Sequence, residues 1–92
     1  MTPEDKLKLI SSMSKATVEK SSYSNQYYVS TVAQIKKDKT LWNVTKHKDT
    51  PEEAINCMFD EMKKADRIVV GAVALHRKEF YYCGSRKRFI EY

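Results

Sequence analysis

The chain is poor in the residues that build long loops, covalent cross-links and membrane anchors. Its 92 residues include only two glycines and two prolines, which leaves little room for a flexible linker. The two cysteines, Cys57 and Cys83, are too few for a disulfide framework, and no Cys-x-x-Cys or His/Cys spacing supports zinc. No apolar run approaches the roughly 20 residues of a membrane-spanning helix. The sequence therefore offers no support for a disulfide-stabilised, zinc-binding or membrane-spanning protein.

The composition is that of an ordinary globular domain. Apolar residues make up 41% of the chain and charged residues 32%, which is too apolar for a disordered protein. A chain of this length supports only one core, so we expect residues 1–92 to form a single domain. The start, MTPEDKLKLISS, is charged and capped like a helix, unlike a signal peptide. We therefore expect a cytoplasmic protein with no membrane partner, in the host cytoplasm if the gene is viral.

The clearest helix signal lies in the first half of the stretch from Thr50 to Leu75. Thr50 suits the N-cap, Pro51 suits the first helical position, and Glu53 completes a Thr-x-x-Glu capping box. Apolar residues then recur at spacings of three and four, which predicts a helix with one buried face. These residues are Ile55, Met58, Phe59, Met62 and Ala65.

The clearest strand signal follows directly. Ile68 to Leu75 is apolar at every position and rich in valine, so both faces of the segment require burial. This pattern predicts a central strand with the helix packed across it, in which Gly71 marks a bulge or a close contact. Since one of the two predicted helices is weak, a homodimer would be one way to cover apolar surface that remains exposed.

The weaker helix is predicted at the N-terminus. Thr2 to Asp5 repeats the N-cap pattern, and Leu7, Ile10 and Met13 form a narrow apolar stripe. The second half, rich in serine and β-branched residues, should make the helix fray or end near Lys20. We therefore expect residues 1–20 to form a helix that packs loosely on the domain or meets a partner.

The segment between the helices has two interpretations. In Gln26–Lys37, alternation predicts a strand, whereas helical spacing would join Tyr28, Val32 and Ile35. Its tyrosines and β-branched residues favour the strand. A hairpin connection at 36–40 and a second strand at 41–47, with Trp42 and Val44 on one face, would follow.

The C-terminal part contains one more predicted strand. Phe80 to Cys83 is short and apolar, and Gly84 and Ser85 end it. The remaining residues, 86–92 (RKRFIEY), either extend this strand or form a basic tail. The expected order is α-β-β-α-β-β, an α+β fold with an antiparallel or mixed sheet and the helices packed on one face.

Catalytic and metal-binding patterns are weak. His47 and His76 each stand alone in their segments, and Gly71 and Gly84 are isolated, so no phosphate-binding loop is present. The acidic residues Glu52, Glu53, Asp60 and Glu61 are best explained as a solvated helix face. We therefore expect a protein that is not an enzyme and that binds no cofactor and no metal.

Charge is distributed unevenly along the chain, whose net charge is +5. Residues 26–48 and 67–92 each carry a net charge of +4, residues 49–66 carry −4, and residues 1–25 carry +1. Basic charge thus follows the predicted strands and acidic charge follows the central helix. This distribution predicts a domain with one basic and one acidic face.

Basic and aromatic residues are interleaved in the predicted strands, and this is the main functional signal. Lysine and arginine can pair with carboxylates or phosphates, and aromatic rings can anchor a protein interface or stack on bases. A partner protein with an acidic surface and a nucleic acid both remain open as ligands. The candidate binding residues are Lys36, Lys37, Lys39, Trp42, Arg77, Lys78, Tyr81, Tyr82, Arg86, Lys87 and Arg88.

The chain is compact, rich in lysine and poor in glycine, and the residues TPEEA open a helix before an apolar strand. In this general style it resembles the small accessory proteins of large tailed phages. This resemblance implies a protein that binds a host factor and modulates or inhibits it. The leading hypothesis is therefore a non-enzymatic protein-binding modulator, and the alternative is a nucleic-acid-binding protein that uses the same residues.

Overall fold

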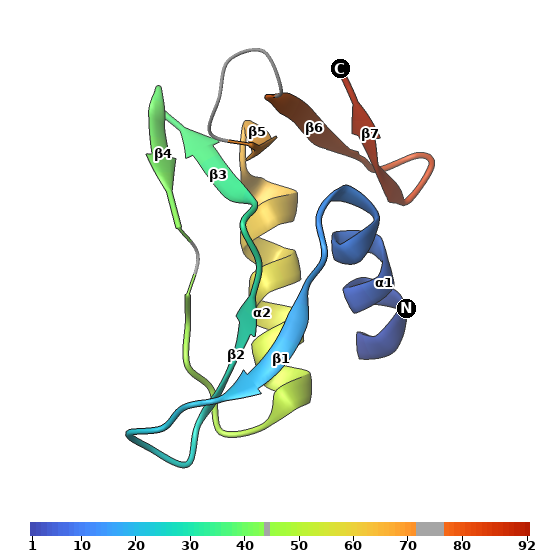
Figure 1. The fold of residues 1–92 in the computed structure, drawn as a ribbon. Coiled ribbons are helices and arrows are strands. Elements are labelled where there is room, and N and C mark those ends of the chain that lie inside the picture. The colour runs from blue at the N-terminus through green and yellow to red at the C-terminus, as the bar shows by residue number, and fades with distance from the viewer. Residues whose placement is uncertain (44, 72–76) are drawn as a thin grey trace.

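A computed structural model describes residues 1–43, 45–71 and 77–92, which form two helices and seven strands (Figure 1). The order is α-β-β-β-β-α-β-β-β, and the α+β class expected from the sequence is confirmed. The elements are α1 (Pro3–Met13), β1 (Thr17–Lys20), β2 (Tyr27–Ser30), β3 (Gln34–Lys37), β4 (Thr40–Trp42), α2 (Pro51–Lys64), β5 (Arg67–Val70), β6 (Lys78–Cys83) and β7 (Arg88–Glu91).

The strands form two antiparallel sheets. β1 and β2 pair as a two-stranded sheet, and the other five lie in the order β4-β3-β5-β6-β7. β5 is the middle strand of the larger sheet, as predicted, and its Ile68 and Val69 are buried. Gly71, with a φ of 98°, follows the end of β5, and residues 72–75 of the predicted strand lie outside the described residues.

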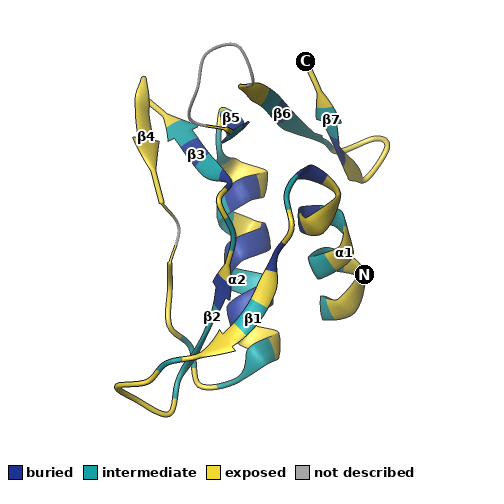
Figure 2. Cartoon of the chain, viewed as in Figure 1, coloured by how far each residue is buried: buried dark blue, intermediate teal, exposed yellow. Residues whose placement is uncertain are grey.

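Helix α2 supplies the largest buried face. Ile55, Met58, Phe59 and Met62 are buried, which confirms the predicted apolar stripe at these four positions (Figure 2). Ala54 is buried as well, whereas Ala65, predicted as part of the stripe, is the partly buried C-cap. The helix contacts β1 and β2 of the small sheet and β6 of the large one, so its apolar face joins the two sheets. At its start the Thr50 hydroxyl accepts from the Glu53 N–H at 3.1 Å and donates to the Glu53 carboxylate at 3.2 Å. The cap is thus made, although without the return bond from the Thr50 backbone that a full capping box contains.

Helix α1 is part of the same core. Its Ile10 is fully buried, Met13 is nearly so, and the helix packs on α2 and β7. A complete capping box at its start joins Thr2 and Asp5 through two bonds of 3.2 Å. Two buried side chains therefore attach even this narrow apolar stripe to the domain.

The first helix is shorter than expected. It ends at Met13, and Thr17–Lys20 forms strand β1, so the predicted end near Lys20 is wrong. Thr17 and Val18 are β-branched and favour a strand, and Val18 pairs with Val29 of β2.

The strand predicted over Gln26–Lys37 is divided between the two sheets. β2 ends at Ser30 and β3 begins at Gln34, and the Thr31 hydroxyl accepts a bond from the Ala33 N–H between them. Such local side-chain bonding competes with a continuous ladder and allows the chain to change sheet. The second predicted strand, 41–47, is also shorter, because β4 ends at Trp42, and Val44 lies outside the described residues.

The C-terminal residues do not form a tail. Arg88–Glu91 is strand β7, which pairs with β6 through the turn at 84–87, and Phe89 is buried. The basic-tail alternative is therefore wrong. Alternation explains the difference, because Phe89 enters the core while Arg88 stays exposed.

The β3–β4 turn places Lys39 in a left-handed backbone conformation that is unfavourable for lysine. Lys37 and Thr40 pair across a two-residue loop in which Asp38 and Lys39 have φ values of 51° and 67°. A type I′ turn requires positive φ at both positions and prefers Asn-Gly.

We expect replacement of Asp38-Lys39 by Asn-Gly to raise the free energy of unfolding by about 0.5–1 kcal/mol in chemical denaturation. Lys37→Gly, inside β3, should lower it, and equal effects of the two changes would contradict this account.

The core position of Met62 gives a second prediction. Its side chain has no exposed surface, so Met62→Ala removes packed volume that the neighbours cannot fully recover. We expect the free energy of unfolding to fall by about 2–5 kcal/mol. Val32→Ala is the control, because Val32 is 72% exposed and its truncation should change stability very little. The two variants are compared by denaturant titration.

Candidate binding surface

The predicted binding residues lie in three places on the large sheet. Lys36, Lys37, Lys39 and Trp42 belong to the β3–β4 hairpin; Arg77 and Lys78 lie at the start of β6; Arg86, Lys87 and Arg88 lie in or beside the β6–β7 turn. The β3–β4 turn and the β6–β7 turn lie on opposite sides of the molecule (Figure 1). One flat partner contact therefore cannot involve all three groups equally.

The two tyrosines predicted as anchors point to opposite faces of β6. Tyr82 packs inside, with its ring centroid 5.5 Å from that of Phe59 and 5.3 Å from that of Phe89. Tyr81 lies on the other face, with its ring centroid 4.9 Å from that of Tyr92. Alternation along a strand makes this unavoidable for neighbouring residues. Tyr81 and Tyr82 therefore cannot anchor the same contact.

The β3–β4 hairpin brings exposed apolar side chains to the edge of the sheet. β4 is the terminal strand in the sheet order, and Leu41 and Trp42 on it are 39% and 55% exposed. Trp42 pairs with Ile35 and Leu41 with Lys36, so the two apolar side chains lie on opposite faces of the hairpin. An edge strand also leaves one row of backbone N–H and C=O groups available for another chain.

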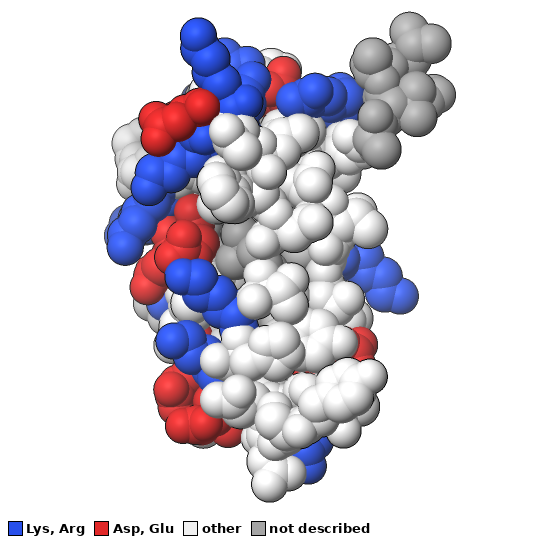
Figure 3. Space-filling model, turned by 90° about the vertical axis from the view of Figure 1, so that its left-hand side faces the viewer, with Lys and Arg blue, Asp and Glu red and all other residues white. Residues whose placement is uncertain are grey.

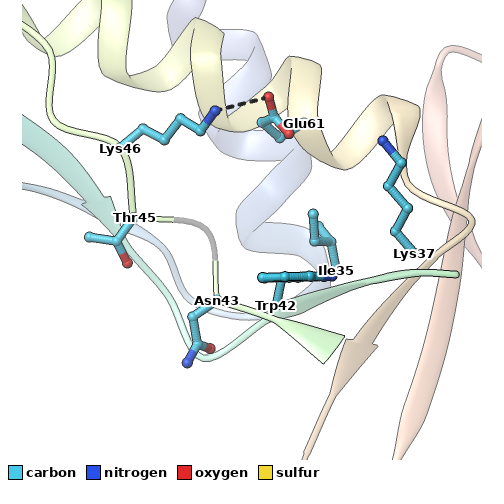
Figure 4. Close-up of a pocket in the computed structure, with 7 residues that line it drawn as sticks. All are labelled: Ile35, Lys37, Trp42, Asn43, Thr45, Lys46 and Glu61. Carbon is cyan, nitrogen blue, oxygen red and sulfur yellow. Dashed lines mark hydrogen bonds and ion pairs between the residues drawn. The ribbon is translucent and has the colours of Figure 1, made fainter. Parts of the chain in front are cut away.

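A hollow of about 290 Å³ lies beside Trp42, between the hairpin and α2 (Figure 4). Ile35 and Trp42 form its apolar side, and Lys37 lies at one end. At the other end Lys46 forms an ion pair of 3.5 Å with Glu61 of α2. The hollow is just below the usual size of small-ligand sites, and it suits one side chain of a partner better than a whole cofactor. Its lining residues are Ile35, Lys37, Trp42, Asn43, Thr45, Lys46 and Glu61.

Acidic and basic side chains are not segregated on this side of the molecule. Figure 3 shows the face that includes the left-hand side of Figure 1, where acidic groups alternate with basic groups along one edge and a broad area carries no charge. The Lys46–Glu61 pair joins the segment after β4 to α2, and a second pair of 3.4 Å joins Arg67 to Glu79 across β5 and β6. Basic and acidic segments that are separate along the chain thus become neighbours in the fold, as Lys46 and Glu61 do.

Among the described residues considered for chemistry, Glu53, Asp60 and Glu61 line one hollow beside α2, and His47 is not part of its lining. His47 is exposed, with its ring centroid 5.0 Å from that of Tyr28, and His76 lies outside the described residues. Glu52 and Glu53 are exposed in the first turn of α2. Within residues 1–43, 45–71 and 77–92, no three potential metal ligands lie together, and no helix is long and apolar enough to cross a membrane.

Cys83, at the end of β6, has an unusual environment. Its Sγ lies 3.2 Å from the Ser85 hydroxyl. Hydrogen bonds from the Ser85 hydroxyl and then from the Arg86 backbone lower the pKa of the Cys83 thiol, with a smaller contribution from the Arg86 charge. The thiolate therefore persists to lower pH than in an ordinary cysteine.

This environment predicts the pH dependence of alkylation. In a Cys57→Ser background, Ser85→Ala removes the main stabilising bond, so the midpoint of the Cys83 alkylation rate should move to higher pH. The rate is followed with iodoacetamide by mass spectrometry across a pH series. Ser24→Ala, far along the chain, should leave the midpoint unchanged. A midpoint that stays in place or moves down in Ser85→Ala would contradict the assignment.

Comparisons with models of protein families, with characterised proteins and with solved structures found no match to this chain.

Proposed function

We propose that this protein is a non-enzymatic binding protein that engages a partner protein through its β3–β4 hairpin. The observation that carries the proposal is the exposed pair Leu41 and Trp42 on the edge strand β4, beside an open hollow. Following the phage resemblance, the partner would be a host protein whose activity is modulated or inhibited. The three parts of the contact are the strand edge, the aromatic anchor and the neighbouring lysines.

The free edge of β4 would set the direction and the register of a partner segment that pairs with it. An extended segment of a partner can add to a free edge by main-chain hydrogen bonds, while alternate side chains enter pockets beside the strand. β4 is short and exposed along its whole length, so the segment that it accepts would also be short. Trp42 and the hollow lie on one face of this edge and would take up one apolar side chain of the segment.

The anchor supplies most of the affinity. Tryptophan is enriched among the residues that dominate interface energetics, because a large rigid ring buries much area for little entropy. The one tryptophan of the chain is 55% exposed, so a partner that covers its ring buries apolar surface and stabilises the complex. Ile35 supports the ring from β3 and lines the same hollow.

The lysines favour a partner with a few carboxylates over a nucleic acid. Lys37 and Lys39 are exposed on the hairpin, and single carboxylates of a peptide can lie opposite them. Asp38 lies between these lysines, and Glu61 lines the hollow. A chain of phosphates would meet these acidic groups at close range and be repelled. Base stacking on Trp42 keeps nucleic acid as the alternative ligand.

The test is the capture of proteins from nuclease-treated and untreated cell extract by wild type, Trp42→Ala and Tyr23→Ala. Tyr23 is the matched control, because it is a 98% exposed aromatic residue away from the hairpin. We expect one protein to be recovered by wild type and Tyr23→Ala in both extracts. Loss of the Trp42 ring should weaken its binding by about 2 kcal/mol or more, roughly thirtyfold in Kd. The recovered protein is then titrated in purified form.

Three outcomes would contradict the proposal. Equal recovery by Trp42→Ala would remove the hairpin from the contact. Recovery that disappears with nuclease would favour the nucleic-acid alternative. A concentration-dependent mass in solution that Leu41→Lys and Trp42→Ala abolish would mean that a second copy occupies β4, which would establish the homodimer instead.

A further inference from the structure

A second hollow lies where α1, α2 and the β6–β7 turn meet, and the charged side chains among the described residues that line it are all lysines. Its volume is about 360 Å³, and Phe59 and Tyr82 form its aromatic floor. Lys6 comes from α1, Lys63 from the last turn of α2, and Lys87 from the turn. α1 and the β6–β7 turn are neighbours on the right-hand side of Figure 1. The lining residues are Met1, Lys6, Phe59, Lys63, Tyr82, Gly84 and Lys87.

Two of the three ammonium groups are held in place over the floor. The Lys6 Nζ lies 5.3 Å from the centroid of the Phe59 ring and donates to the Asn56 side-chain oxygen at 3.0 Å. The Lys63 Nζ lies 5.4 Å from the centroid of the Tyr82 ring. Cation–π contacts of this kind orient an ammonium without neutralising it. The positive charge is therefore positioned before any ligand arrives.

None of the described residues that line this hollow carries a carboxylate. The ion pairs found among the described residues, Lys46–Glu61 and Arg67–Glu79, belong to other parts of the molecule. Lys63 and Lys87 are exposed and Lys6 is partly buried. Three like charges that share one hollow favour an anion of two or more charges there.

The backbone of Lys87 shows that the β6–β7 turn does not itself require a lysine at this position. Its φ is 53°, in the left-handed region that costs residues other than Gly and Asn about 1–2 kcal/mol. Its N–H closes the turn by donating to the Cys83 carbonyl at 2.7 Å, a bond that any residue with an N–H would make. The turn therefore does not require lysine at this position. A side chain at Gly84 would meet no atom within 4 Å, so the hollow is open on this side.

We propose that Lys6, Lys63 and Lys87 bind the phosphate group of a small molecule, a phosphomonoester or a diphosphate. Three ammonium donors match an anion with several acceptor oxygens and two or more charges. The hollow, with a volume of about 360 Å³, is large enough for a small organic group attached to the phosphate. This site shares no residue with the β3–β4 hairpin surface, so it stands independently of the proposed partner contact.

The test uses inorganic pyrophosphate and adenosine monophosphate as probes, titrated against full-length protein at constant ionic strength. Binding is followed by the amide signals of the β6–β7 turn in NMR spectra. Lys87→Asn removes one charge while placing a residue that tolerates positive φ, so the variant should fold at least as well as wild type. Lys39→Asn is a matched control, because it makes the same change at a φ of 67° in the other hairpin turn.

We expect wild type and Lys39→Asn to bind with equal Kd, and Lys87→Asn and Lys63→Gln each to weaken binding about fivefold or more. Tighter binding of adenosine monophosphate than of pyrophosphate would assign the site to a phosphomonoester whose organic group contributes to binding. Tighter binding of pyrophosphate than of adenosine monophosphate would assign the site to a diphosphate. Equal weakening by Lys39→Asn and Lys87→Asn would overturn the proposal, because it would mean that net charge alone attracts the probes. No binding of either probe at millimolar concentration would overturn it as well.

Discussion

The burial of one face of α2 is the interaction on which the rest of the structure depends. Its apolar stripe contacts the small sheet through β1 and β2 and the large sheet through β6, and Met62 is fully enclosed. Neither sheet has another helix of comparable apolar width, because α1 contributes mainly Ile10 and Met13. The two sheets therefore share a core only because one helix lies against both. The loss of that shared face would leave the two-stranded sheet of β1 and β2 too small to be stable alone.

This arrangement explains why the edge of the large sheet is available for binding. Ile35, Ile68 and Phe80 belong to the buried core, whereas β4 lies at the periphery of the sheet and pairs on one side only among the described strands. Natural proteins usually protect such edges with charges, prolines or bulges. Here the protection consists of lysines at the hairpin tip, while Leu41 and Trp42 remain exposed farther along the strand. Aggregation at this edge is limited by its short length, since β4 has only three residues.

Much of the core could be predicted from the sequence because its signals are local. The N-cap at Thr50, the spacing of the α2 face and the apolar run at Ile68 are each contained within a few residues. The change of sheet between Ser30 and Gln34 was not predictable in this way, because alternation continues through it and only tertiary packing decides which sheet each half joins. The strand β7 was missed because a basic segment with one buried Phe89 has too weak a pattern.

The candidate sites show the same division between local and tertiary information. Lys37 and Trp42 could be selected from the interleaving of basic and aromatic residues, but the contribution of Glu61 to their hollow depends on how α2 packs beside the hairpin. Lys6 and Lys63 could not be selected at all, because they belong to separate helices whose ends meet only in the folded chain. Net charge per segment is a poor guide for the same reason. Folding pairs some basic groups with acidic groups and gathers others in a hollow whose described lining contains no acid. The charge of the second kind is not balanced by a neighbouring acid and is available to an anionic ligand.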